Sequence, residues 1–174
     1  MQIAVLGCLF ILTVAASQTG CVSPAPPVHL YQIGDRVELG SVVYNVLEAD
    51  WRPQLSEAAM VRFPAHRFLV VRLSVTNGGG QPVSIPSFKL VDDGGRVFDE
   101  SFDGQFVPSW LGLMRKVKPV ETLVGNILFD VDAKSYKLKL NDDGDSGQPA
   151  LVEMPLRFGL ERPAVPSALD TPLR

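Results

Sequence analysis

The chain has 174 residues, with 16 basic and 19 acidic side chains and a formal net charge of −3. This length fits a single domain, and the acidic balance excludes the strongly basic surface of a usual nucleic-acid-binding protein. Because 46% of the residues are hydrophobic, a core of ordinary size can form. Glycine and proline, at 15 and 14 residues, are too few for a low-complexity chain, and they predict many turns.

Residues 1–20 predict a secretory signal peptide. No charged side chain occurs between Met1 and Gly20, and Thr13 is the one polar side chain in the apolar run from Ile3 to Ala16. A transmembrane helix needs about twenty apolar residues, whereas the apolar centre of a signal peptide has about seven to fifteen. We therefore expect export and an extracytoplasmic location in the cell envelope.

The small residues before Cys21 resemble the lipobox of bacterial lipoproteins. Thr19 and Gly20 fit its small positions, whereas Gln18 stands where the pattern usually has leucine. Cleavage between Gly20 and Cys21 would leave Cys21 as an acylated first residue, and each methylene of its acyl chains that the membrane buries contributes about 0.8 kcal/mol. The alternative is ordinary signal cleavage after Ser17.

Cysteine usage separates the N-terminal segment from the rest of the chain. Cys8 and Cys21 are the two cysteines of the sequence, so the chain after residue 21 cannot form an internal disulfide. Residues 21–30 contain Ser23-Pro24-Ala25-Pro26-Pro27, which predicts an extended, proline-rich tether between a lipidated Cys21 and the domain.

Residues 31–160 predict one all-β domain. Short segments rich in valine, leucine, phenylalanine and tyrosine alternate with glycine-bearing turns, a pattern typical of a sandwich or a barrel. Strands are expected at residues 35–39, 42–51, 66–76, 83–91, 96–101, 122–131, 136–140 and 151–158. Residues 161–174 contain three prolines and no strong period, and we expect them to form a flexible C-terminal tail.

Several strands carry positional signals. Residues 136–140 alternate apolar side chains with lysine, which predicts one buried and one solvated face. Residues 122–131 are apolar at both parities, and we expect a doubly covered strand in the middle of a sheet. Pro155 favours an edge strand or a bulge, because proline donates no ladder hydrogen bond. Residues 92–95, Asp-Asp-Gly-Gly, predict a tight hairpin turn.

A series of short motifs also resembles a known family. The motifs are Tyr31-Gln32-Ile33-Gly34-Asp35, Tyr44-Asn45-Val46, Phe68 to Asn77, Phe88 to Asp92 with Gly95, Lys118-Pro119, Gly125 to Asp130 and Lys137 to Leu140. Across residues 31 to 140 the chain resembles a family of bacterial exported lipoproteins with an immunoglobulin-like domain of unknown function, related to immunoprotective extracellular antigens.

This resemblance implies an immunoglobulin-like β-sandwich of about 7–9 antiparallel strands, with no catalytic residues to transfer. Some members of the family carry a telomeric-repeat-binding label. An acidic, exported chain has neither the compartment nor the basic surface for telomeric DNA, so we expect no nucleic-acid partner.

The sequence offers no catalytic or metal-binding constellation. His29 and His66 are its two histidines, and a structural zinc site commonly needs four histidine or cysteine ligands. The acidic stretch 141–147 has Ser146 at the sixth position, where an EF-hand loop needs glycine. The pattern G-x-S-x-G is absent as well. We therefore expect no metal, no cofactor and no enzymatic activity.

The connection from Phe102 to Gly112 is rich in large apolar side chains. Aromatic loop residues can anchor a partner because they bury much area at little cost in rotamer entropy, and Phe106 and Trp110 are the candidate contacts. They can also close the open end of the sandwich, the interpretation favoured for Trp110. Trp51 and Phe63 have the same two interpretations.

Six basic residues fall within one stretch of the second half. They could share a surface that faces anionic lipid headgroups or envelope glycans, although ordinary solvated strand faces explain the same charges. They are Arg115, Lys116, Lys118, Lys134, Lys137 and Lys139.

The sequence as a whole predicts a non-enzymatic, lipid-anchored envelope protein whose domain binds another envelope component, with a protein as the expected partner. The tether and the aromatic loop favour binding. A secreted or envelope-associated hydrolase is the alternative function.

Overall fold

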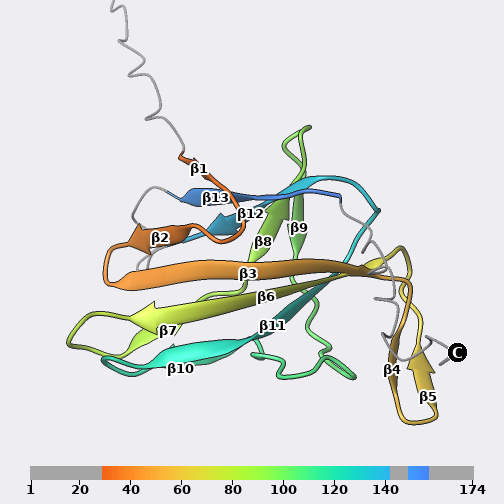
Figure 1. The fold of residues 1–174 in the computed structure, drawn as a ribbon, viewed down its shortest axis with the longest axis horizontal. Helices are drawn as coiled ribbons and strands as arrows, with labels where there is room; N and C mark the ends of the chain where they lie inside the picture. Colours follow the sequence, from red (N-terminus) through yellow and green to blue (C-terminus); the bar gives the residue numbers. More distant parts are fainter. Residues whose placement is uncertain (1–28, 142–148, 157–174) are drawn as a thin grey trace, which may run out of the picture.

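The structure is a computed structural model that describes residues 29–141 and 149–156. Thirteen β-strands are present in these residues (Figure 1). They form two principal sheets packed face to face, with a large apolar core between them. The all-β, immunoglobulin-like sandwich predicted from the sequence is confirmed, and its two principal sheets contain nine strands.

The first principal sheet has five strands in the order β1-β13-β12-β8-β9. Their bounds are β1 Leu30–Tyr31, β13 Ala150–Met154, β12 Tyr136–Leu140, β8 Lys89–Val91 and β9 Val97–Asp99. The second principal sheet has four strands in the order β11-β6-β3-β2. Their bounds are β11 Thr122–Asp130, β6 Phe68–Asn77, β3 Val42–Arg52 and β2 Arg36–Leu39.

Two small sheets complete the fold. β7 (Val83–Ile85) pairs with β10 (Arg115–Val117), and β4 (Leu55–Glu57) pairs with β5 (Met60–Arg62). The hairpin β4–β5 projects from one end of the molecule, whereas β1 lies at the other end (Figure 1).

Strand periodicity explains the core. In β6, Leu69, Val71, Leu73 and Val75 are fully buried between the sheets, because alternate residues of a strand share one face. Each such side chain contributes about 1.5 to 3 kcal/mol on burial. The alternation predicted for β12 is confirmed, since its apolar residues are buried and its lysines are not.

The predicted turns also form. Gly40, in the two-residue turn between β2 and β3, has a φ of 58°. Between β8 and β9, Gly95 has a φ of 79° and donates its N–H to the Asp92 carbonyl at 2.9 Å. Both positions require the left-handed backbone that glycine adopts without steric cost.

The single strand expected at residues 83–91 is wrong. The segment divides into β7, which pairs with β10, and β8, which pairs with β9 and β12 in the five-stranded sheet. Pro86 lies between the two strands and has no N–H to donate, so it interrupts the ladder where the chain changes sheets.

For residues 122–131 the sequence predicted a strand that is covered on both faces and lies in the middle of a sheet, and only the first part is correct. Both faces of β11 are covered in its second half, where Ile127, Leu128 and Phe129 are fully buried, whereas Val124 in its first half is 48% exposed. However, β11 lies at the edge of its sheet, and the two inner strands are β6 and β3. Apolar side chains at both parities therefore indicated two covered faces, not a central place in the ladder.

The last strand also differs from expectation. β13 ends at Met154, one residue before Pro155, and it lies between β12 and β1 instead of at an edge. Its pairing with β1 is parallel, in contrast to the expected antiparallel strands. That pairing includes Leu30, which the sequence placed in the tether. Within the described ranges, no helix is long and apolar enough to cross a bilayer.

Candidate functional site

The connection between β9 and β10 is an Ω-shaped loop closed at its neck by a buried ion pair. Glu100 and Arg115 form this pair, and both side chains are fully buried. The Glu100 carboxylate also accepts the Phe88 N–H at 3.0 Å, and the Arg115 guanidinium lies 4.9 Å from the centre of the Phe88 ring. Loops whose ends are held together in this way are frequently functional.

Burial raises the pKa of Glu100, and the neighbouring Arg115 charge opposes that rise. Removal of one partner would leave the other charge buried without compensation, which is strongly destabilising. The ion pair therefore makes the position of the loop, residues 101–114, depend on the core beneath it.

The middle of the loop is held against the edge of β11. The Leu111 N–H donates to the Asn126 carbonyl, and the Asn126 N–H donates to the Ser109 carbonyl, both at 3.0 Å. This is a parallel bridge centred on Trp110 and Asn126. It satisfies the backbone groups that an edge strand would otherwise expose.

Two glycines provide the space for this contact. A Cβ atom on Gly125 would collide with the Ser109 carbonyl and with Leu111, and one on Gly104 would collide with the Trp110 indole. A glycine inside a strand often marks the close approach of another backbone, and Gly125 in β11 does so here.

Below the loop lies a second apolar cluster, on the outer face of the four-stranded sheet. Trp110 and Phe106 are half-buried against it. The cluster is separate from the core between the sheets and consists of the buried residues Leu55, Phe68, Val70, Val107 and Leu128. Trp110 thus covers the outside of a sheet and does not close the open end of the sandwich.

The outer side of the loop exposes apolar side chains beside the hairpin β4–β5. The Arg62 guanidinium joins the two segments, since it donates to the Asp103 carbonyl at 3.0 Å and to the Gln105 carbonyl at 3.3 Å. Phe102 is 82% exposed and Phe63 is 71% exposed. We name this region the aromatic surface and define it by Met60, Val61, Phe63, Phe102 and Phe106.

Three of the four non-glycine residues with positive φ in the described part of the chain lie in the same region, and the fourth, Val120, lies in the connection between β10 and β11. Ala58, Phe106 and Ser109 have φ values of 51°, 63° and 48°. A left-handed backbone costs a residue other than glycine roughly 1 to 2 kcal/mol. Such strain persists when the surrounding structure imposes it, and it is found preferentially at functional sites.

A groove separates the loop from the hairpin. It has a volume of about 230 Å³ and is lined by Ser56 and Glu57 of β4 and by Phe106, Val107 and Pro108 of the loop. The wall formed by the loop is therefore apolar. The wall formed by β4 presents the edge of the strand and the Glu57 carboxylate.

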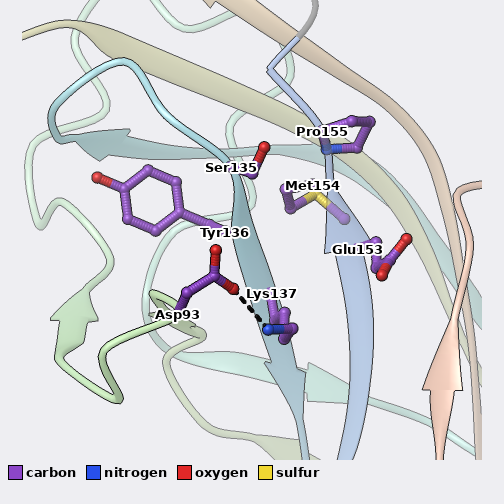
Figure 2. A pocket seen from close by; sticks show the side chains of 7 residues that line it. All are labelled: Asp93, Ser135, Tyr136, Lys137, Glu153, Met154 and Pro155. Atoms are coloured by element: carbon purple, nitrogen blue, oxygen red, sulfur yellow. Dashed lines mark hydrogen bonds and ion pairs between the residues drawn. The ribbon is translucent and has the colours of Figure 1, made fainter.

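A second hollow, of about 210 Å³, lies beside the ends of β12 and β13 (Figure 2). Figure 2 shows Lys137 reaching Asp93, at 2.8 Å, while Glu153 extends from the neighbouring strand. The bond to Asp93 raises the pKa of Lys137, so the amine stays protonated and cannot act as a base. Glu153 accepts a hydrogen bond from the Gln32 amide at 2.6 Å.

The nearby Asp92 carboxylate has a structural role at the β8–β9 turn. Lys134 and Arg96 each donate to it at 2.8 Å, and the hydrogen bond from Lys134 is the main cause of a pKa well below the usual range. Burial raises the pKa of Tyr136 to about 12. Neither group is thereby adapted for proton transfer near neutral pH.

Comparison with known proteins identifies the domain. The family model described as "Domain of unknown function (DUF4352)" matches residues 31–149. The chain belongs to this family. No match was found among curated protein sequences.

Solved structures share the fold of this DUF4352 domain at low identity. The yjhA protein of Bacillus subtilis is 14% identical, with a TM-score of 0.54 over 71% of this chain and 98% of that one. A conserved hypothetical protein of Bacillus anthracis is 16% identical, with a TM-score of 0.51 over 70% and 94% of the two chains. The candidate lipoprotein ycdA of Bacillus subtilis is 14% identical, with a TM-score of 0.51 over 70% and 38%.

The structure describes some of the site residues expected from the sequence and not others. Phe106 and Trp110 come together on the second apolar cluster of the DUF4352 domain. Gly20 and Cys21, and with them the signal cleavage and lipidation sites, lie outside the described residues. The relation to immunoprotective antigens stays a prediction.

The shared basic surface, which the sequence offered as an alternative to ordinary solvated strand faces, does not form as one patch. Arg115 is buried against Glu100, and Lys134 and Lys137 pair with Asp92 and Asp93. The described residues, which include His29 and His66, contain no group of three histidine, cysteine, aspartate or glutamate side chains that could hold a metal ion.

Sequence reasoning missed the two features that position the loop. Glu100 and Arg115 are fifteen positions apart in the chain. No local sequence pattern therefore predicts that they form an ion pair. Gly125, in contrast, carried a usable signal, because glycine in a run of β-formers indicates a close backbone contact.

Proposed function

We propose that this chain is a non-enzymatic, lipid-anchored cell-envelope protein whose DUF4352 domain binds another envelope protein through the aromatic surface. The observation that carries the proposal is the aromatic loop itself. Its neck is fixed by the buried Glu100–Arg115 pair, and Phe102 remains 82% exposed.

A fixed loop with exposed aromatic side chains is suited to protein recognition. Binding costs less conformational entropy when the contact residues are already held in place. Phenylalanine adds large apolar area with few rotatable bonds, and apolar side chains that stay exposed next to one another commonly mark interaction sites. Phe63, which directly follows β5, extends this area beyond the loop.

The position of the aromatic surface fits an N-terminal anchor. β3 runs from Val42 to Arg52, a length of about 33 Å at 3.3 Å per residue, and β4–β5 follows its far end. β1 lies at the opposite end (Figure 1). An anchor at Cys21 would therefore direct the aromatic surface away from the membrane, toward other envelope proteins.

The family and its structural neighbours support the coarser part of this proposal. A DUF4352 chain with a candidate lipoprotein among its structural neighbours is compatible with an extracytoplasmic location. Labelling cells with a fatty-acid analogue tests the anchor. We expect Cys21→Ala to abolish the label and Cys8→Ala to retain it, and an unmodified protein beginning at Gln18 would contradict lipidation.

Photo-crosslinking in living cells tests the binding surface. A photoreactive residue at position 102 should attach a partner protein, whereas the same residue at Val97, which is 56% exposed on β9, should not. Equal crosslinking at both positions, or none at 102, would show that the aromatic surface binds no envelope protein.

A further inference from the structure

The groove between β4 and the loop has the features of a peptide site. In a hairpin with a two-residue turn, the residues that flank the turn, here Glu57 and Met60, form a hydrogen-bonded pair. Hydrogen-bonded and non-hydrogen-bonded pairs alternate along an antiparallel ladder. The next residue, Ser56, therefore directs its backbone N–H and C=O away from β5. Ser56 lines the groove. An extended segment can therefore bind there through main-chain hydrogen bonds, as segments do at other strand edges.

The side chains of the groove specify what such a segment should carry. Phe106, Val107 and Pro108 form an apolar wall, which suits aliphatic and proline side chains. Glu57, on the opposite rim, has no ion pair with any residue in the described part of the chain. A basic side chain would complement it.

The chain itself leaves the domain at the same end of the sandwich. Met154 pairs with Tyr136, and the Tyr136 ring lies 6.2 Å from the ring of Trp51. Trp51 is the penultimate residue of β3, which leads directly into the hairpin β4–β5. The chain beyond Leu156 therefore starts near the base of the hairpin.

We propose that the C-terminal segment of this chain, residues 163–174, binds in the groove between β4 and the loop. The segment contains prolines at 163, 166 and 172, which favour an extended backbone that costs little entropy to immobilise. Its aliphatic residues Val165, Leu169 and Leu173 suit the apolar wall, and Arg174 suits Glu57.

The intervening chain is long enough. Six residues lie between Leu156 and Pro163, and the seven steps from Leu156 to Pro163 can span about 22 Å at 3.1 Å per residue. The two principal sheets lie about 10 Å apart, so this length is sufficient for the chain to reach the outer face of the four-stranded sheet from the end of the sandwich.

Covalent attachment makes even a weak contact effective. A segment on a short linker is present at an effective concentration in the millimolar range, so it occupies the groove whenever its intrinsic dissociation constant is of that order. In the free protein, the segment then covers part of the surface beside Phe106 and competes with any partner for it. This inference goes beyond the proposed partner binding and does not depend on it.

Disulfide trapping in the full chain tests the proposal. With Cys8 and Cys21 changed to serine, the pair Glu57→Cys and Leu169→Cys is compared with the pair Asp132→Cys and Leu169→Cys in a glutathione buffer. Asp132 is exposed and lies nearer to the exit of the chain, since its carbonyl accepts the Tyr136 hydroxyl. Random motion of the segment would therefore favour position 132.

We expect the intrachain disulfide from position 57 to form at least about tenfold faster than that from position 132, because docking raises the local concentration. Adding Val165→Asp and Leu173→Asp should reduce this ratio to one or below. Leu173→Cys repeats the test in a second register, and Ser56→Cys replaces position 57 if Glu57→Cys lowers the melting temperature. Equal rates at 57 and 132 in both registers would overturn the proposal, as would disulfides that form only between chains, which would indicate a second copy in the groove.

Discussion

The hairpins β8–β9 and β4–β5 show two ways of using the same local structure. β8–β9 has glycines in its turn, buries Leu90 fully and fixes its turn through Asp92. β4–β5 turns at Ala58 with a left-handed backbone, and Met60 is 57% exposed. The first hairpin contributes to stability, whereas the second stores strain beside exposed apolar area, as expected of a binding region.

The largest effect should follow truncation inside the sandwich. Phe129 is fully buried, so Phe129→Ala should lower the free energy of unfolding by about 3 to 5 kcal/mol. Phe102→Ala, on the exposed loop, is the matched control and should change it by less than about 0.5 kcal/mol. Chemical denaturation measures both, and similar values for the two variants would remove the distinction between core and surface.

The neck of the loop should be nearly as sensitive. Glu100→Gln leaves the buried Arg115 guanidinium without its counter-charge, and the expected loss is about 3 to 5 kcal/mol. Because the pair fixes the loop, partner crosslinking from position 102 should also fall in this variant under conditions where it remains folded. Retention of full stability would show that the loop is held without the ion pair.

Trp110 links the stable part of the molecule to the aromatic surface. Its ring is half-buried against the second apolar cluster, so Trp110→Ala should cost about 2 to 3 kcal/mol, less than a fully buried aromatic residue. Thermal melting checks this value. Gly104→Ala should lower the melting temperature as well, since a Cβ atom there collides with the indole. A stable Trp110→Ala protein that no longer crosslinks would instead assign Trp110 to the partner.

The β8–β9 turn should depend on pH. The pKa of Asp92 is lowered, so its contribution is fully present above the ordinary carboxyl pKa of about 4 and is lost as pH falls below that value. Asp92→Asn should therefore lower the melting temperature at pH 7, and its difference from the wild type should narrow at pH 3. Asp93→Asn is the control, because Asp93 is 82% exposed. A difference that does not change with pH would contradict this account.

Local patterns predicted local structure well. The alternation in β12, the turn at Asp92 to Gly95 and the strands expected at 35–39 and 42–51 depend on neighbouring residues. The structure confirms them. The place of β11 at a sheet edge could not be predicted, because its outer side is covered by residues 109–111 and not by a strand.

In the candidate site, too, only local features could be predicted. The sequence showed that the loop is rich in aromatic residues, and it indicated Phe106 and Trp110 as candidate contacts. The second apolar cluster could not be predicted, because it brings Leu55, Val107 and Leu128 together from three distant segments. The Glu100–Arg115 pair required knowledge of how the loop closes, which no short-range pattern contains.

The smallest effect should come from the turn of β4–β5, and there the sign is the informative quantity. Ala58 has a left-handed backbone, whereas Ala59 does not. Ala58→Gly relieves the steric cost of that conformation, while Ala59→Gly only adds backbone entropy to the unfolded chain, at about 0.5 to 1 kcal/mol. Ala58→Gly should therefore be the more stable of the two by about 1 kcal/mol. If both variants lose the same stability, the strain at Ala58 is absent in solution, and the contrast between the two hairpins then rests on exposed apolar area alone.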